Sequence, residues 1–194
     1  MIRTKLLTVF AMSVLPFGQA IAQGNDSILD FIDGRYEDTA KLARTIWEYA
    51  EVGYQETRSS TLLQETLSGE GFAIEAGVAS IPTAFVATHG NGGPVIAILA
   101  EFDALPGISQ DRTPVRQPRV EVESGHACGH HLFGAGSTAA AIAVREWLEA
   151  SGTPGTVRLY GTPADTTSSV PGLLARQSQS STGWKKRERQ APFA

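Results

Sequence analysis

Three of the chain's four histidines and its only cysteine lie within six residues, in the segment Gly125-His126-Ala127-Cys128-Gly129-His130-His131. Thiolate and imidazole are donors that zinc prefers, and the Cys-Gly-His spacing lets two of them meet one ion. The flanking glycines give the backbone the freedom to wrap closely. Metal binding is the leading interpretation. A Cys–His nucleophilic pair and a buried thiol beside surface imidazoles remain open as alternatives.

Two carboxylates form a second cluster, because Glu101 and Asp103 directly follow the apolar run 94–100. Open α/β sheets bind ligands beyond the carboxyl ends of their strands. Residues two apart on an extended chain share one side, so both carboxylates could point into a single site. The alternative is a pair of solvated loop carboxylates.

The pattern of apolar residues predicts the elements that would position these clusters. Helices are expected over 27–50 (with Gly34 able to split it), from residue 57 to the glycines at 69 and 71, and over 130–150. Strands are expected over 72–75, 83–88, 94–100 and 156–161. The order predicts an α/β fold with helices packed on a mixed sheet.

Two of these expectations concern the run 94–100. It is expected to form a hairpin with 83–88 and, being apolar on both faces, to be an interior strand of a covered sheet. The segment 101–129 is predicted to be a long loop, and a long loop inside a compact domain is usually functional.

Composition narrows the class of protein. The 194 residues are 42% hydrophobic and 19% charged with a net charge of −4, which is ordinary for a soluble protein and argues against a nucleic-acid partner. The single cysteine excludes an internal disulfide.

Residues 1–22 have the pattern of an export signal. Arg3 and Lys5 precede an uncharged apolar run, and Ala20-Ile21-Ala22 supplies the small residues of a cleavage site. The run is shorter than the roughly 20 residues that a membrane span needs. We therefore expect a signal peptide over 1–22, no membrane span, and a protein that is exported to the periplasm or secreted.

The segment 165–194 differs from the rest of the chain. It is basic and lacks apolar periodicity, whereas 23–164 is acidic. This composition predicts a divergent, disordered tail. The abrupt change after Ala164 is typical of translation in a shifted frame, so a frameshifted or truncated product is expected. A genuine variant tail and a short paralogue are the alternatives.

Four ordered fragments resemble the zinc peptidases and amidohydrolases of peptidase family M-twenty, in the branch of aminobenzoyl-glutamate hydrolase and the N-acyl-amino-acid amidohydrolases. The fragments are Asp-Ala-Leu-Pro-Gly at 103–107, Gly-His-Ala-Cys-Gly-His at 125–130, Glu-Val-Gly-Tyr-Gln-Glu-Thr at 51–57 and Leu-Tyr-Gly-Thr-Pro-Ala at 159–164. The resemblance implies that 23–164 is the N-terminal part of a zinc-peptidase-like catalytic domain.

The resemblance also implies a function. Family enzymes use two divalent metal ions, zinc or alternatively manganese, to cleave the amide bonds of small N-acyl amino acids or dipeptides. The resemblance further implies homodimers formed through an inserted domain, which we expect to be absent from this chain.

By the same resemblance, Cys128 would be a thiolate ligand that could bridge both ions, and His130 a second ligand. Asp103 would be the catalytic-site carboxylate that orients a ligand. Glu101 stands where other branches have a histidine ligand, and His126 would lie just outside the ligands. His131 departs from the Asn or Asp usual at its position.

One family feature is missing from the sequence. The family follows Gly-Thr-Pro-Ala with two glutamates, a general base and a metal ligand, whereas here Asp165 and Thr166 follow Ala164. The metal site is therefore expected to be incomplete and the chain weakly active or inactive. A non-catalytic exported metal-binding or interaction protein is the alternative, and a hydrolase using Cys128 as nucleophile is a third.

Overall fold

In a computed structural model, residues 17–163 are described, with side chains from Asp26 onward. The helices are α1 Phe17–Gly34, α2 Tyr36–Tyr49, α3 Thr57–Gly69 and α4 His130–Ser151, with a short 3₁₀ turn at Val78–Ser80. The strands are β1 Ala73–Ala76, β2 Phe85–Asn91, β3 Val95–Glu101 and β4 Gly155–Thr162. The break predicted at Gly34 is confirmed, since α1 ends there, but the expected start at residue 27 is wrong because α1 already begins at Phe17. Residues 1–16 and 164–194 lie outside the described residues. They include most of the predicted signal peptide and the whole predicted tail.

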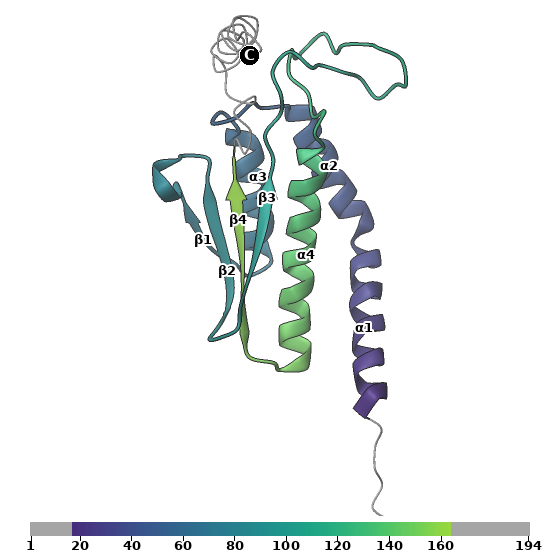
Figure 1. Ribbon diagram of the computed structural model, residues 1–194, viewed down its shortest axis with the longest axis vertical. Helices are drawn as coiled ribbons and strands as arrows, with labels where there is room; N and C mark the ends of the chain where they lie inside the picture. The colour runs from purple at the N-terminus through teal and green to yellow at the C-terminus, as the bar shows by residue number, and fades with distance from the viewer. Residues whose placement is uncertain (1–16, 164–194) are drawn as a thin grey trace, which may run out of the picture.

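The four strands form a mixed sheet in the order β1-β2-β4-β3. Pairing is antiparallel between β1 and β2 and between β2 and β4, whereas β3 and β4 are parallel. The parallel pair is joined through α4, as parallel strands require a crossover. Figure 1 shows this two-layer arrangement, with the long loop at the end of the sheet where β3 and β4 finish. The expected α/β fold with a mixed sheet is confirmed.

Two expectations about β3 are wrong. The strands β2 and β3 do not form a hairpin, because β4 lies between them and pairs with both. In this central place, Val157 and Leu159 of β4 are fully buried. Within the part of the chain that the structure describes, β3 is therefore an edge strand rather than an interior one.

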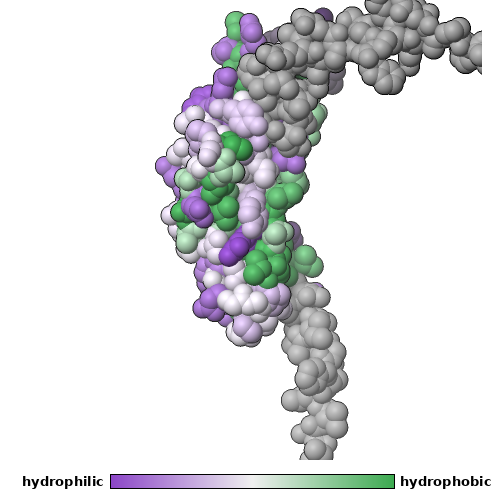
Figure 2. All heavy atoms as spheres, turned by 60° about the vertical axis from the view of Figure 1, so that its left-hand side comes forward, coloured by the Kyte–Doolittle hydropathy of each residue, from purple (hydrophilic) through white to green (hydrophobic). Residues whose placement is uncertain are grey.

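One face of the sheet carries the core. Alternate residues of β4 are buried, and Arg158 between them is exposed, as a strand with one covered face requires. The opposite face leaves Val95 and Leu99 of β3 more than half exposed. Figure 2, which brings the β1–β2 side forward, shows apolar patches among hydrophilic ones on the surface. The largest fully buried apolar side chains are Phe85, Phe102, Ile46, Leu63, Leu67, Ile142 and Leu159.

No helix among the described residues is long and apolar enough to cross a membrane.

Candidate metal-binding site

The start of α4 packs closely against the end of β3 at Gly134. A Cβ atom placed on Gly134 would lie 2.7 Å from the carbonyl oxygen of Glu101, so only glycine lets the first turns of α4 approach the strand this closely. Phe102, with no exposed surface, anchors the end of the strand in the core. This packing places His130, the first residue of α4, beside Asp103.

Both carboxylates of the second cluster contact the imidazole of His130. Its Nδ1 lies 2.8 Å from Oδ1 of Asp103, and its Nε2 lies 3.2 Å from Oε2 of Glu101. Asp103 and His130 are buried, whereas Glu101 is partly exposed. The carboxylates therefore lie in one site, not in a solvated loop. Asp103 fixes the imidazole through one nitrogen, which is how proteins commonly orient a histidine that binds metal through the other.

The other carboxylate oxygen of Asp103, Oδ2, is buried and has no hydrogen-bond partner among the described residues. A buried carboxylate oxygen without a partner is costly in free energy, and bound water or a cation would relieve that cost. The donor chemistry at this position thus suits a cation site.

The structure does not bring a complete ligand set together. Cys128 is exposed, and the described residues include no group of three His, Cys, Asp or Glu side chains able to hold one ion. Asp103 and Glu101 engage opposite nitrogens of His130, so these three side chains do not converge on one point. The described residues fit one part of a metal site, an oriented imidazole with an exposed thiol two residues before it.

His126 and His131 lie apart from that pair. The Nε2 atom of His126 is 3.1 Å from the carbonyl oxygen of Ile46 near the end of α2, and the two histidine rings are 4.9 Å apart. Burial, with the neighbouring His131, lowers the pKa of His126 to about 4. Burial also lowers the pKa of His131. Both rings are therefore neutral near pH 7, and His126 ties the metal-site turn to α2.

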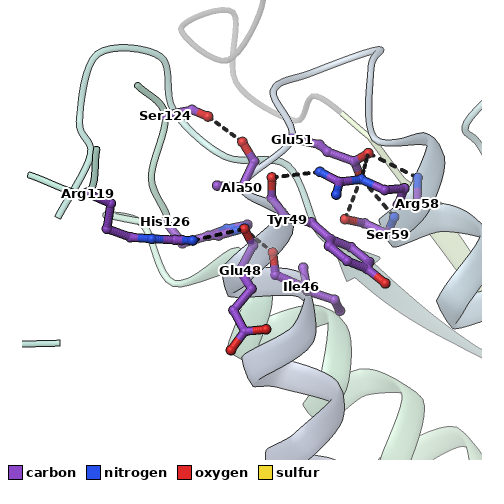
Figure 3. A network of polar contacts seen from close by, with 10 residues as sticks. All are labelled: Ile46, Glu48, Tyr49, Ala50, Glu51, Arg58, Ser59, Arg119, Ser124 and His126. Carbon is purple, nitrogen blue, oxygen red and sulfur yellow. Dashed lines mark hydrogen bonds and ion pairs between the residues drawn. The ribbon is translucent and has the colours of Figure 1, made fainter. Parts of the chain in front are cut away.

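A polar network supports the loop that leads to the site (Figure 3). The carboxylate of Glu51 accepts hydrogen bonds from the backbone N–H groups of Arg58 and Ser59, in the first turn of α3, and from both side chains. These bonds satisfy N–H groups that a helix start leaves unpaired. The carbonyl of Glu51 accepts a bond of 2.7 Å from the N–H of Ala104, next to Asp103. The network thus couples α3 to the site.

Sequence reasoning missed Glu56, which is fully buried. Its carboxylate accepts hydrogen bonds from the hydroxyl of Thr83 at 2.9 Å and from the N–H of Tyr54 at 2.8 Å. Burial, with a smaller contribution from the negative charge of Asp103, raises the pKa of Glu56 to about 7 against the lowering effect of those bonds. The fragment 51–57 contained this residue, but nothing in its spacing shows that the side chain points inward.

Comparison with solved structures shows the same fold. The chain is similar to the YXEP protein of Bacillus subtilis, described as a dinuclear metal binding peptidase from the M-twenty family, with a TM-score of 0.58 and 28% identity. That match covers 68% of this chain and 36% of the other. The fold is therefore that of part of a metallopeptidase domain.

Comparison with characterised sequences gives a consistent result. The chain is 40% identical over 160 residues to a component of the p-aminobenzoyl-glutamate hydrolase of Escherichia coli (strain K12), covering 82% of this chain and 33% of that protein. It is 33% identical over 146 residues to the Xaa-Arg dipeptidase of Mus musculus. That match covers 69% of this chain and 30% of the dipeptidase. No protein-family model matches the chain. The chain belongs to the M-twenty family, and it spans about a third of the length of these relatives.

Proposed function

We propose that this chain carries part of the metal site of an amidohydrolase that cleaves N-acyl amino acids or dipeptides. The observation that carries the proposal is the imidazole of His130, the first residue of α4, held 2.8 Å from buried Asp103. A bound metal ion would polarise the scissile carbonyl and lower the pKa of water. The similarity to a hydrolase and a dipeptidase supports this reaction class.

Each residue has a separate task in the proposed site. Cys128 and His130 would hold the metal, zinc by preference because thiolate and imidazole suit it, with manganese as the alternative. Asp103 would keep the proton of His130 on Nδ1, which leaves Nε2 for the ion. Glu101 now contacts that same Nε2 and would have to move aside or become a ligand itself.

Metal titration tests the proposal. Metal-free full chain is titrated with Zn²⁺ and then Mn²⁺ by calorimetry, and stoichiometric zinc binding is expected. Cys128→Ser and His130→Gln each remove a ligand and should abolish stoichiometric binding. Asp103→Asn should weaken it about 10- to 100-fold. His89→Gln is the matched control, because His89 lies on β2, where it pairs with Glu149.

Turnover separates the hydrolase from the alternatives. Hippurate and p-aminobenzoyl-glutamate are assayed with zinc and again after chelation. Turnover that chelation abolishes supports the hydrolase, whereas zinc uptake without turnover favours the non-catalytic metal-binding protein. Activity that survives chelation and requires Cys128 indicates a cysteine nucleophile. A chain that binds no zinc refutes the proposal.

We also propose that the protein is exported, on the pattern of residues 1–22. Fractionation of cells expressing the full chain tests this, with N-terminal sequencing of the product. A product that begins at Gln23 in the periplasmic or secreted fraction is expected. An uncleaved product in the cytoplasmic fraction contradicts the proposal.

A further inference from the structure

The carboxyl end of α2 supports the turn that carries the proposed metal ligands. The last carbonyl groups of a helix have no partner within the helix and find one elsewhere. Here the carbonyl oxygen of Ile46 lies 3.1 Å from Nε2 of His126. The carbonyl of Ala50 accepts a hydrogen bond from the hydroxyl of Ser124. Figure 3 shows both contacts, which fix the segment before Cys128 to the end of α2.

The strand end that carries Asp103 is fixed to the turn that follows α2. The N–H of Ala104 donates to the carbonyl of Glu51 at 2.7 Å, next to a parallel bridge between the two segments. Because Ala104 directly follows Asp103, the position of the turn 51–56 sets where the carboxylate of Asp103 lies relative to His130. A residue that holds this turn therefore also holds the site.

The turn 51–56 contains a residue in an unfavourable backbone conformation. Tyr54 has a φ of 63°, in the left-handed region that a side chain disfavours. Burial of its side chain does not account for this conformation, because Tyr54 is 50% exposed. In this conformation its N–H donates to Oε1 of Glu56 at 2.8 Å. Glu56 therefore stabilises a turn that its own backbone preferences oppose.

The carboxyl group of Glu56 is itself held in place. Its Oε2 accepts a hydrogen bond of 2.9 Å from the hydroxyl of Thr83. The carbonyl of Thr83 in turn accepts a bond of 2.7 Å from the hydroxyl of Ser60, and all three residues are buried. Burying a carboxyl costs free energy that an apolar side chain of similar size avoids. The presence of Glu56 at this position indicates a task beyond filling the core.

Glu56 also lies close to the site that the turn supports. The negative charge of Asp103 contributes to the raised pKa of Glu56, so the two buried carboxyl groups are near enough to interact. The hydrogen bonds of Glu56, however, go to Tyr54 and Thr83. Its effect on the site therefore runs through the turn.

We propose that Glu56 is a positioning residue of the candidate metal site. Its carboxyl holds Tyr54 in the left-handed conformation, and the turn then presents the carbonyl of Glu51 to the strand end. Asp103 is thereby kept against the imidazole of His130. The role rests on the proposed function, since the site it serves is the proposed metal site. The turn requires a hydrogen-bond acceptor at this position, so an amide should replace the carboxyl and a hydrocarbon should not.

A proton signal of His130 tests the proposal without metal. An imidazole Nδ1–H that donates to a buried carboxylate exchanges slowly and resonates downfield in NMR spectra of the full chain, labelled at histidine nitrogen. Glu56→Leu should remove or weaken this signal, whereas Glu56→Gln should keep most of it. Zinc affinity measured by calorimetry should follow the same order. A loss of about three- to tenfold is expected in Glu56→Leu, smaller than that for Asp103→Asn.

Two further variants separate positioning from stability. Val157→Ala is the matched control, because it removes buried methyl groups from β4 and leaves the turn 51–56 untouched. It should keep the His130 signal and the zinc affinity although it unfolds more readily in urea. Adding Tyr54→Gly to Glu56→Leu should restore the signal, because glycine adopts a positive φ without strain.

Several outcomes overturn the proposal. They are a wild type without the His130 signal, an unchanged signal in Glu56→Leu, an equal loss in Val157→Ala, and no restoration by Tyr54→Gly. Zinc titrations separate this inference from the proposed function. Equal zinc affinity in the wild type and Glu56→Leu overturns this inference alone. A wild type that binds no zinc overturns the proposed metal site, and the His130 signal still decides whether Glu56 positions Asp103.

Discussion

Replacing Glu56 with glutamine should change how stability depends on pH. Glu56 has no exposed surface, and burial is the largest cause that raises its pKa, from the ordinary 4.5 to about 7. Its two hydrogen bonds, from Thr83 and Tyr54, partly offset that effect without cancelling it. The folded protein therefore holds a proton on Glu56 between pH 4.5 and 7, where the unfolded chain has released it.

The proton held by Glu56 decides the direction in which stability changes with pH. Because the folded state binds more protons in this interval, the free energy of unfolding falls as pH rises from 4.5 to 7. The difference between the two pKa values corresponds to about 3 kcal/mol at most. Glutamine stays neutral, so the Glu56→Gln variant lacks this loss. Between pH 4.5 and 7, the free energy of unfolding of the variant should therefore rise by about 3 kcal/mol relative to that of the wild type.

Urea unfolding of metal-free protein, followed by tryptophan fluorescence from pH 5 to pH 8, measures this difference. Glu75→Gln is the control, because Glu75 is an exposed carboxylate on β1. The control profile should run parallel to that of the wild type. If the Glu56→Gln profile also runs parallel to the wild type, burial does not hold the proton on Glu56 and the reasoning is wrong.

Further predictions concern α4 and the metal-site turn. Gly134→Ala should destabilise the protein by about 1–3 kcal/mol in thermal unfolding, because the new Cβ meets the carbonyl of Glu101. Gly136→Ala, in the same helix with nothing within 4 Å, should instead stabilise it by up to about 1 kcal/mol. A loss of thermal stability in both variants would contradict the close packing of Gly134 on β3. His126 has a lowered pKa, so its contribution to stability is present above pH 6.5 and is lost as pH falls towards 4. Urea midpoints of His126→Gln should therefore fall less in acid, and an unchanged acid sensitivity would count against this assignment.

The local pattern predicted the helices and the mixed sheet well, because apolar spacing and glycine breaks act over a few residues. Gly34 ends α1 and Thr57 begins α3, both as expected. The pairing of strands was predicted less well. Proximity in the chain favoured a hairpin between β2 and β3, but β4 lies between them and pairs with both. A contact across about sixty residues leaves no periodic signal in either strand.

The sequence by itself determined which side chains could bind a metal, since residue type fixes donor chemistry. It supplied Asp103, Cys128 and His130 and the fragments that mark the family. The tertiary structure decided which of them meet. It joined Asp103 and Glu101 to His130, left Cys128 exposed and turned His126 towards α2. It also buried Glu56 and set its carboxyl against Tyr54 and Thr83. Distances and solvation depend on packing between elements that are remote in sequence, so spacing along the chain does not specify them.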